Sequence, residues 1–495
     1  MKKLLLRYGI VFNLVLGVFL RLYHLGVRDF WYDEAFSGIV VKEGWGRMVE
    51  IISQDTHPPL YFIGLKVWGF FFNYSVYGLR LFSVVWGILA IYLVYLILKQ
   101  IAGFRSAWIG SFLLAVNPFA IQYSQEARMY AMLGTLLLAT SYFFFKARSG
   151  EKLRDYILFG VSFASALLTH YFAFIFGIII LLWLIYDLYL KSRLTSRSFI
   201  REVFNLVKNK KLWLGVLTML VIFALWLPNF RAQWETREAK IDWISRPNPG
   251  DVVSNFQIFL IGSPPGMMGA PEPNEVRFLS PEALIVLVLG FIGIILISLV
   301  KQKNYLAWYF AIGSLGYVFV TYLLTYLKLD YLISRYLIGA GYLFIVLISI
   351  WLGSLKTKLA LGIVTGYLVL ILLIDFPVSL TGYNQLKRAE GDYQNNNFYT
   401  LDTYEYVIAK YYFGFDKVIL FNADWPEYNP KDWLGVNGEI KRAVKWEEVV
   451  EDSRGLVLWN ETTRPSLNFD YMHFAVVRNY ANLNILQARS VNSGR

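Results

Sequence analysis

The feature that most constrains the fold is a series of long apolar runs that are almost free of charge. They fall at 4–23, 81–98, 106–122, 129–145, 156–170, 171–190, 212–230, 283–300, 305–327, 336–355 and 359–376. A helix needs about 20 apolar residues to cross a bilayer, so these 11 runs are candidate membrane spans. Only 17% of the 495 residues are charged, against about 25% in soluble proteins. The sequence therefore predicts an all-α polytopic membrane protein with about 11–13 transmembrane helices.

The orientation depends on a twelfth apolar piece, 59–73, which has only 15 residues and contains Lys66. If this piece does not cross, the short loops separate by charge. One side holds 20 Lys or Arg and four acids, in 1–7, 99–105, 146–155, 187–211, 301–304 and 356–358. The other side holds 12 basic and 15 acidic residues, in 24–78, 123–128, 231–282 and 328–335. Because basic loops stay in the cytoplasm, we expect 59–73 to be interfacial or re-entrant.

The ends of the chain complete this topology. The start has a basic stretch like a signal peptide, but its apolar part is too long and no small-residue cleavage site follows, so we expect an uncleaved first helix. We thus expect a multi-pass protein of the cell (plasma) membrane with a cytoplasmic N-terminus. From about residue 377 charges become frequent, with strand-like runs at 417–421, 455–459 and 473–477 and helical patterns near 401–412 and 446–452. The predicted domains are a transmembrane domain at 1–376 and a small extracytoplasmic α/β domain at 377–495.

Composition also excludes several kinds of site. The chain has no cysteine, which excludes disulfides, thiolate metal sites and cysteine nucleophiles. Its formal charge of +12 lies mostly in the short loops that orient the protein, and no basic tail or nucleic-acid motif is present. We therefore expect a lipid bilayer and no nucleic acid as a partner.

Polar residues of chemical interest gather in the loops that are predicted to be external. The first of these loops, 24–78, contains "RDFWYDEAFSG" with Asp33 and Glu34, and then "SQDTHPPLYF" with Asp55 and His57. A carboxylate at the membrane surface could act as a general base, and a carboxylate with an imidazole could bind a divalent cation. The alternative is a polar loop whose acids face water.

Three further corners bring charge to the same predicted side. Glu126 and Arg128 interrupt two apolar spans, His170 lies in a tight turn, and Arg335 begins a span. Arginine suits phosphate because it is permanently charged and donates two parallel hydrogen bonds. The alternatives are an interfacial Arg128 paired with Glu126, a structural histidine and an interfacial arginine anchor. Together these groups suit a phosphate-bearing lipid whose head group reacts outside the membrane, since polar groups at this depth are costly and usually functional.

Several motifs occur in an order that is typical of one family of membrane enzymes. The motifs are "WYDEAFS", "DTHPPLYF", "RLFSVVWG", "NPFAIQYSQEARMYAM", "LLTHY" and "SRYL". Over about residues 1–376 the chain closely resembles the class C glycosyltransferases of the protein mannosyltransferase superfamily. It is most similar to the prokaryotic members of glycosyltransferase family 39, which use polyprenyl- or dolichyl-phosphate sugars.

The resemblance implies an inverting transfer of a single, mannose-like sugar from a polyprenyl-phosphate donor to an external glycan, lipid or protein acceptor. It places Asp33 at the proposed catalytic acidic position, with Glu34 as the second member of the pair. It places Arg128 and Arg335 near the donor phosphate. Substrate or metal contacts are implied for the remaining candidates, which are Asp55, His57, Glu126, Tyr130 and His170, with Asp55 and His57 as the pair for a divalent cation.

Two departures from relatives limit the transfer of detail. Where aminoarabinose transferases tend to have Glu-Lys-Pro, this chain has Thr56-His57-Pro58. The loop 231–282 is also too short for the β-trefoil domain of the eukaryotic protein mannosyltransferases. Two other functions stay open from the sequence, a transporter or flippase of lipid-linked sugars and a structural membrane protein. The first would need charged or broken helices at mid-membrane, and the second would not need acids, histidines and arginines on one face.

Overall fold

The computed structural model describes most of the membrane region and part of the C-terminal region. The described residues are 2–195, 198–235, 247–262, 281–302, 304–327, 332–375, 393, 396–400, 403–413, 418–421, 442–443, 455–460, 474–480 and 483–488. They form two compact units. The first comprises Met1–Tyr23, Thr56–Tyr61 and Arg80–Ser379, and the second comprises His24–Asp55, Phe62–Leu79 and Leu380–Arg495. The sequence-based division at residue 376 stays a prediction.

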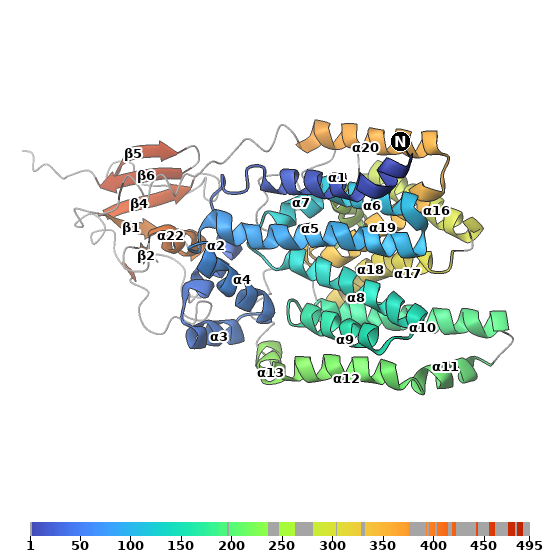
Figure 1. Cartoon of the computed structure of the whole chain (residues 1–495). Helices are drawn as coiled ribbons and strands as arrows, with labels where there is room; N and C mark the ends of the chain where they lie inside the picture. The colour runs from blue at the N-terminus through green and yellow to red at the C-terminus, as the bar shows by residue number, and fades with distance from the viewer. Residues whose placement is uncertain are drawn as a thin grey trace, which may run out of the picture. The chain divides into compact units, whose positions relative to one another are not determined.

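The first unit is helical, and its long helices run in a similar direction (Figure 1). Its earlier helices are α1 (Lys2–Leu22), α5 (Val76–Ile101), α6 (Gly103–Val116), α7 (Pro118–Ser124), α8 (Tyr130–Gly150), α9 (Leu153–Leu167), α10 (Ala173–Thr195), α11 (Phe199–Val207), α12 (Lys210–Ala224) and α13 (Leu227–Glu235). Its later helices are α15 (Pro249–Ile261), α16 (Pro281–Gln302), α17 (Ala307–Ala311), the π-helical η1 (Ile312–Gly316), α18 (Tyr317–Tyr326), the 3-10 turn η2 (Ser334–Leu337), α19 (Ile338–Ser354) and α20 (Thr357–Asp375).

The predicted helical membrane fold is confirmed, with fewer full-length spans than expected. Five helices of the described chain are long and apolar enough to cross a membrane, or up to seven if each of two bent pairs is one span. The bends are 58° between α6 and α7, and 64° between α12 and α13. A proline lies at or beside each break, Pro118 in the first pair and Pro228 in the second. Proline favours such a break because it lacks the backbone N–H that would continue the hydrogen bonds of the helix. Other predicted runs form shorter apolar helices in the described part of the chain, namely Gly9–Leu22, Val286–Gln302 and Thr357–Leu373.

Close helix packing in this unit depends on small residues, as in many membrane bundles. A Cβ atom on Gly160 of α9 would lie 2.1 Å from the carbonyl oxygen of Gly215 on α12. In return, a Cβ atom on Gly215 would lie 2.5 Å from the carbonyl oxygen of Tyr156. Two glycines therefore set the distance between these two helices.

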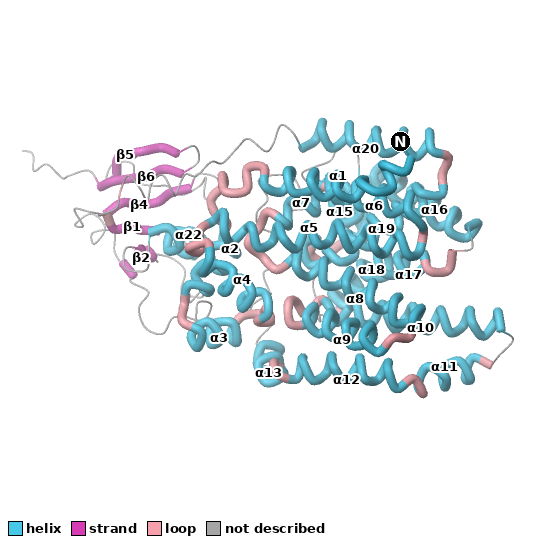
Figure 2. The backbone as a smooth tube through the Cα atoms, in the orientation of Figure 1, coloured by secondary structure: helices cyan, strands magenta, loops and turns pink. Residues whose placement is uncertain are grey.

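The second unit combines short helices with a mixed sheet (Figure 2). Its elements are α2 (Tyr32–Lys42), α3 (Trp45–Gln54), most of α4 (Leu60–Phe71), β1 (Asn397–Thr400), α22 (Thr403–Phe413), β2 (Val418–Phe421), β3 (Arg442–Ala443), β4 (Gly455–Asn460), β5 (Phe474–Tyr480) and β6 (Leu483–Ala488). The strand order is β3-β2-β1-β4-β6-β5. The first four strands in this order pair in parallel, and β6 pairs antiparallel with β4 and β5.

The strand-like runs predicted at 417–421, 455–459 and 473–477 fall on β2, β4 and β5, and the helical pattern near 401–412 falls on α22. The helix expected near 446–452 lies outside the described residues. The apolar piece 59–73 forms the 12-residue helix α4, which is shorter than a bilayer-spanning helix.

Candidate active site

The two adjacent acids of the first predicted external loop lie in the first turn of α2. Carboxylates are favourable there because the free N–H groups of a helix start carry partial positive charge. Their surroundings differ, since Glu34 is fully buried and Asp33 is partly exposed. The hydroxyl of Ser37 donates to the carbonyl of Asp33 over 2.9 Å, one turn along the helix. Asp33 is thus the more accessible acid of the pair.

Two further charged residues of this loop lie at or near helix ends. Asp55 is the C-cap residue of α3 and is 8% exposed. The ammonium of Lys66 on α4 donates to the carbonyl of Val41 over 3.0 Å and to that of Glu43. It therefore satisfies carbonyls at the end of α2, as basic side chains do at helix C-termini.

A separate polar cluster lies in the first unit, at the ends of its helices. We name it the histidine–arginine cluster; its members are His57, Arg128, Tyr130, His170, Arg335 and Tyr336. They come from four segments. His57 lies between α3 and α4, Arg128 and Tyr130 lie at or just before the start of α8, His170 lies in the turn between α9 and α10, and Arg335 and Tyr336 lie in η2. The Leu60 amide donates to the Leu168 carbonyl over 2.9 Å and so fixes the first of these segments to the third.

The His170 ring lies at the centre of this cluster. Its centroid is 4.8 Å from that of Tyr336, 5.3 Å from that of His57 and 6.3 Å from that of Tyr130. The sequence had singled out His57, Tyr130 and His170 from three separate motifs, and the structure brings them together. Tyr336 was missed as a site residue, because an aromatic side chain at the start of a span is ordinary and carries no signal of its own.

The tautomer of His170 follows from its hydrogen bonds. The Phe172 amide donates to Nδ1 over 3.2 Å, so in the neutral ring the proton is on Nε2. Nε2 is buried and has no hydrogen-bond partner within the described part of the chain. Burial holds the pKa of His170 well below its ordinary value, and the neighbouring His57 and the two arginines of the cluster lower it further. His170 is therefore a neutral imidazole that presents an N–H donor.

Both predicted phosphate-binding arginines belong to the same cluster. Arg128 is 2% exposed, and its backbone carbonyl accepts the Ser83 hydroxyl over 3.3 Å. The guanidinium carbon of Arg335 lies 5.5 Å from the centroid of the Tyr336 ring. Both cations act on the pKa of His170, so all three side chains share one electrostatic environment. Two permanent cations beside a neutral donor suit a phosphate-sized anion.

The remaining predicted residues are buried or capping groups. Glu126 lies two residues before Arg128 in the segment between α7 and α8 and is 7% exposed. No group of three or more His, Cys, Asp or Glu side chains that could hold a metal is found among the described residues. The proposed pair for a cation, Asp55 and His57, falls in different units, and its metal role stays a prediction.

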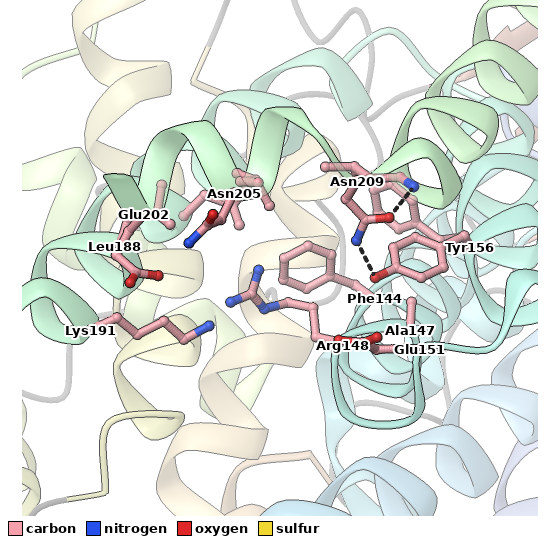
Figure 3. A pocket seen from close by; sticks show the side chains of 14 residues that line it. Phe144, Ala147, Arg148, Glu151, Tyr156, Leu188, Lys191, Glu202, Asn205 and Asn209 are labelled. Carbon is pink, nitrogen blue, oxygen red and sulfur yellow. Dashed lines mark hydrogen bonds between the residues drawn. The ribbon is translucent and has the colours of Figure 1, made fainter. Parts of the chain in front are cut away.

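A cavity of about 200 Å³ lies elsewhere, between α8, α9, α10, α11 and α12 (Figure 3). Arg148 and Lys191 extend into it, but both pair with Asp187, Lys191 over 3.3 Å. The Asn209 side chain at its rim donates to the Tyr156 hydroxyl over 3.0 Å. Arg148 and Asp187 thus pair between α8 and α10, Lys191 and Asp187 pair within α10, and the cavity contains none of the predicted site residues.

Part of the chain matches a known protein family in sequence. Residues 56–228 match the family described as "Dolichyl-phosphate-mannose-protein mannosyltransferase". The matched segment contains His57, Glu126, Arg128, Tyr130 and His170, while the acids of α2 and Arg335 lie outside it. A search of curated protein sequences found no match.

Solved structures match along nearly the whole chain. ArnT from Cupriavidus metallidurans in the apo state has a TM-score of 0.61 at 12% identity, over 96% of this chain and 97% of that chain. The same protein bound to undecaprenyl phosphate has a TM-score of 0.62 at 12% identity, over 98% and 99%. The oligosaccharyltransferase AglB from Archaeoglobus fulgidus, in complex with an inhibitory peptide and a dolichol-phosphate, has a TM-score of 0.49 at 14% identity, over 83% and 64%. The fold assignment rests on the two ArnT structures.

These findings confirm the resemblance that the motifs indicated. The chain has the class C glycosyltransferase fold of ArnT, and its segment 56–228 matches the protein mannosyltransferase family. The enzyme class and the multi-pass membrane character predicted from the sequence are therefore confirmed.

Proposed function

We propose that this membrane glycosyltransferase moves a single sugar, mannose or a close relative, from a polyprenyl-phosphate donor to a hydroxyl of an extracytoplasmic acceptor. The observation that carries the proposal is the histidine–arginine cluster, where two arginines lie close enough to His170 to act on its pKa and the neutral ring offers an N–H donor. The family description names a dolichyl-phosphate-mannose donor, and the similar ArnT structure holds undecaprenyl phosphate. Both support a lipid-linked phosphate as the anion.

The arginines supply what the leaving group needs. As the bond between the anomeric carbon and the phosphate oxygen breaks, negative charge grows on the phosphate. Arg128 and Arg335 stabilise this charge, and the N–H of His170 donates to the same group. Such fixed donors lower the barrier most where charge develops in the transition state. The neutral state of His170 lets it donate without adding a third full positive charge.

Asp33 serves the other half of the reaction. The acceptor hydroxyl oxygen attacks the anomeric carbon from the face opposite the phosphate, which inverts the configuration, and its proton passes to the Asp33 carboxylate. A general base of this kind contributes about 10²–10⁴-fold to the rate. Glu34 is fully buried in the same first turn of α2, where its negative charge is favourable at the helix start.

The test is incubation of the purified protein with polyprenyl-phosphate sugars and candidate glycan, lipid and protein acceptors, followed by mass spectrometry. We expect one added hexose per acceptor, with release of polyprenyl phosphate. Asp33→Asn should reduce transfer by about 10²–10⁴-fold. The matched control is Glu50→Gln, an exposed acid of the same loop, which should keep full activity. Transfer that survives Asp33→Asn would remove Asp33 as the base, and transport of the lipid without transfer would favour the flippase alternative.

A further inference from the structure

The helix that carries Asp33 is held by two tyrosines that follow Asp33 by more than 370 residues. Tyr411 and Tyr412 lie at the end of α22, which belongs to the same compact unit as α2. Neither tyrosine comes from the first external loop, and no motif had indicated a role for them. Their contacts fall on both sides of Asp33 along α2.

Tyr411 contacts α2 along its length. Its ring centroid is 4.7 Å from that of Phe30, which precedes the helix, and the ammonium of Lys42, the last helical residue, is 4.1 Å from the same centroid. Between them, a Cβ atom at Gly38 would lie 2.5 Å from the Tyr411 ring. The absence of a side chain at Gly38 thus lets the ring lie directly against the helix backbone.

The two hydroxyls add directional bonds. The Phe30 amide donates to the Tyr412 hydroxyl over 2.8 Å, in a buried position three residues before Asp33. The Tyr411 hydroxyl donates to the Tyr74 carbonyl over 2.8 Å. The two tyrosines therefore contact the start of α2 at Phe30, the helix itself at Gly38, and the far end of the same loop at Tyr74.

The tyrosines are themselves fixed by the sheet of this unit. The next residue, Phe413, stacks on Phe398 of β1 with ring centroids 3.7 Å apart. On the same helix, Tyr406 and Val407 are 0% and 2% exposed. A helix anchored in this way is a rigid support for α2.

We propose that Tyr411 and Tyr412 are positioning residues for Asp33, and that the C-terminal α/β region serves to hold α2 in its reactive orientation. This inference rests on the proposed role of Asp33 as the base. Bonds at Phe30 and packing at Gly38 fix the first turn of α2 from both sides, so their loss lets the carboxylate shift. A displacement of about 1 Å at a reacting group can cost about 100-fold in rate.

The test combines kinetics with hydrogen–deuterium exchange on the full-length protein. Tyr412→Phe removes the acceptor of the Phe30 amide, and Tyr411→Ala removes the ring from the α2 backbone. We expect kcat to fall about ten- to 100-fold with the donor KM unchanged. We also expect faster exchange in the peptide that covers residues 30–42.

Leu458→Ala on β4 is the matched control, because it removes buried volume from the sheet and leaves both the tyrosine contacts with α2 and the stacking of Phe413 in place. It should lower the melting temperature and leave kcat unchanged. If exchange in α2 stays at the wild-type rate in both tyrosine variants, or if kcat falls in all three variants in proportion to melting temperature, the positioning role is wrong. The exchange result does not depend on activity, whereas retained activity in Asp33→Asn would overturn the proposed base and leave the exchange result standing.

Discussion

At the scale of single residues, the protonation state of His170 decides what the histidine–arginine cluster can bind. A charged imidazole beside Arg128 and Arg335 would add a third cation in a buried place. Instead, burial and these neighbours keep the ring neutral, with Nδ1 accepting the Phe172 amide and Nε2 carrying the proton. The cluster thus offers two permanent charges and one neutral donor, which suits the phosphodiester of the lipid-linked sugar that we propose as its ligand.

Arg335 gives the first prediction at this scale. Arg335→Ala removes one of the two permanent cations, so kcat/KM for the lipid donor should fall about ten- to 100-fold. Arg335→Lys keeps the charge but loses the fork-like donor pair, and it should recover only part of that loss. Arg231→Ala is the control, because this arginine is highly exposed on α13. Donor kinetics in Arg335→Ala equal to those of the control would contradict a role in phosphate binding.

His170 gives the second prediction, which concerns pH. Its folded pKa lies well below the ordinary value near 6.5. Below about pH 6.5 the unfolded chain therefore takes up a proton that the folded chain does not, so acid destabilises the folded state. The melting temperature should fall between about pH 7 and pH 5, and His170→Gln should reduce that fall. The exposed Gln54, which does not titrate, should leave it unchanged when it is replaced by Asn. An equal pH dependence in wild type and His170→Gln would refute the assignment.

At the scale of elements, the sequence motifs located the helix ends where the cluster forms but not how the ends meet. His57, Tyr130 and His170 could be chosen because each is a polar residue at the end of an apolar run. Tyr336 could not, because an aromatic at a span boundary is ordinary, and only the packing of η2 against the α9–α10 turn places its ring 4.8 Å from His170. Contacts between segments far apart in the chain have no local signal.

The number of full-length membrane spans could not be predicted from the sequence either. Apolar runs were correctly assigned to helices, but length in sequence did not reveal where a helix breaks. The break between α6 and α7 occurs where Asn117 accepts the Ala120 amide over 2.9 Å and so caps a new helix at Pro118. A hydropathy run counts both halves as one segment. Local capping at Asn117 thus divides one predicted span into two helices. The apolar character of the run, which defines the fold class, was predicted correctly.

The contact between α9 and α12 gives the third prediction. A methyl group at Gly160 would lie 2.1 Å from the carbonyl oxygen of Gly215, so Gly160→Ala must push the two helices apart. We expect destabilisation by about 1–3 kcal/mol, as for other overpacked sites, measured as a lower melting temperature in detergent. Gly290→Ala on α16 is the matched control, since among the described residues no atom lies within 4 Å of its new methyl group. Equal melting temperatures for the two variants would show that the helices are not fixed by these glycines.

At the scale of the whole molecule, the second compact unit joins distant parts of the chain. Its helices α2 and α3 come from the first 55 residues, and its sheet comes from the last 100 or so. Strand-length apolar runs predicted β2, β4 and β5. They could not predict that α22 packs on α2, because that contact depends on two tyrosines and one glycine rather than on any periodic pattern.

Orientation in the membrane gives the last prediction. The loops 146–155 and 187–211 are rich in Lys and Arg, while the first loop, 24–78, has more acids than bases, so the positive-inside rule places them on opposite sides. Because the native chain has no cysteine, single cysteines report their own side only. In intact cells, Lys208→Cys should be shielded from an impermeant thiol reagent added outside, and Glu50→Cys should react. The reverse labelling pattern would place Asp33 in the cytoplasm, where the acceptor would have to be cytoplasmic too. Labelling of Lys208→Cys after permeabilisation is the control that the introduced thiol is reactive.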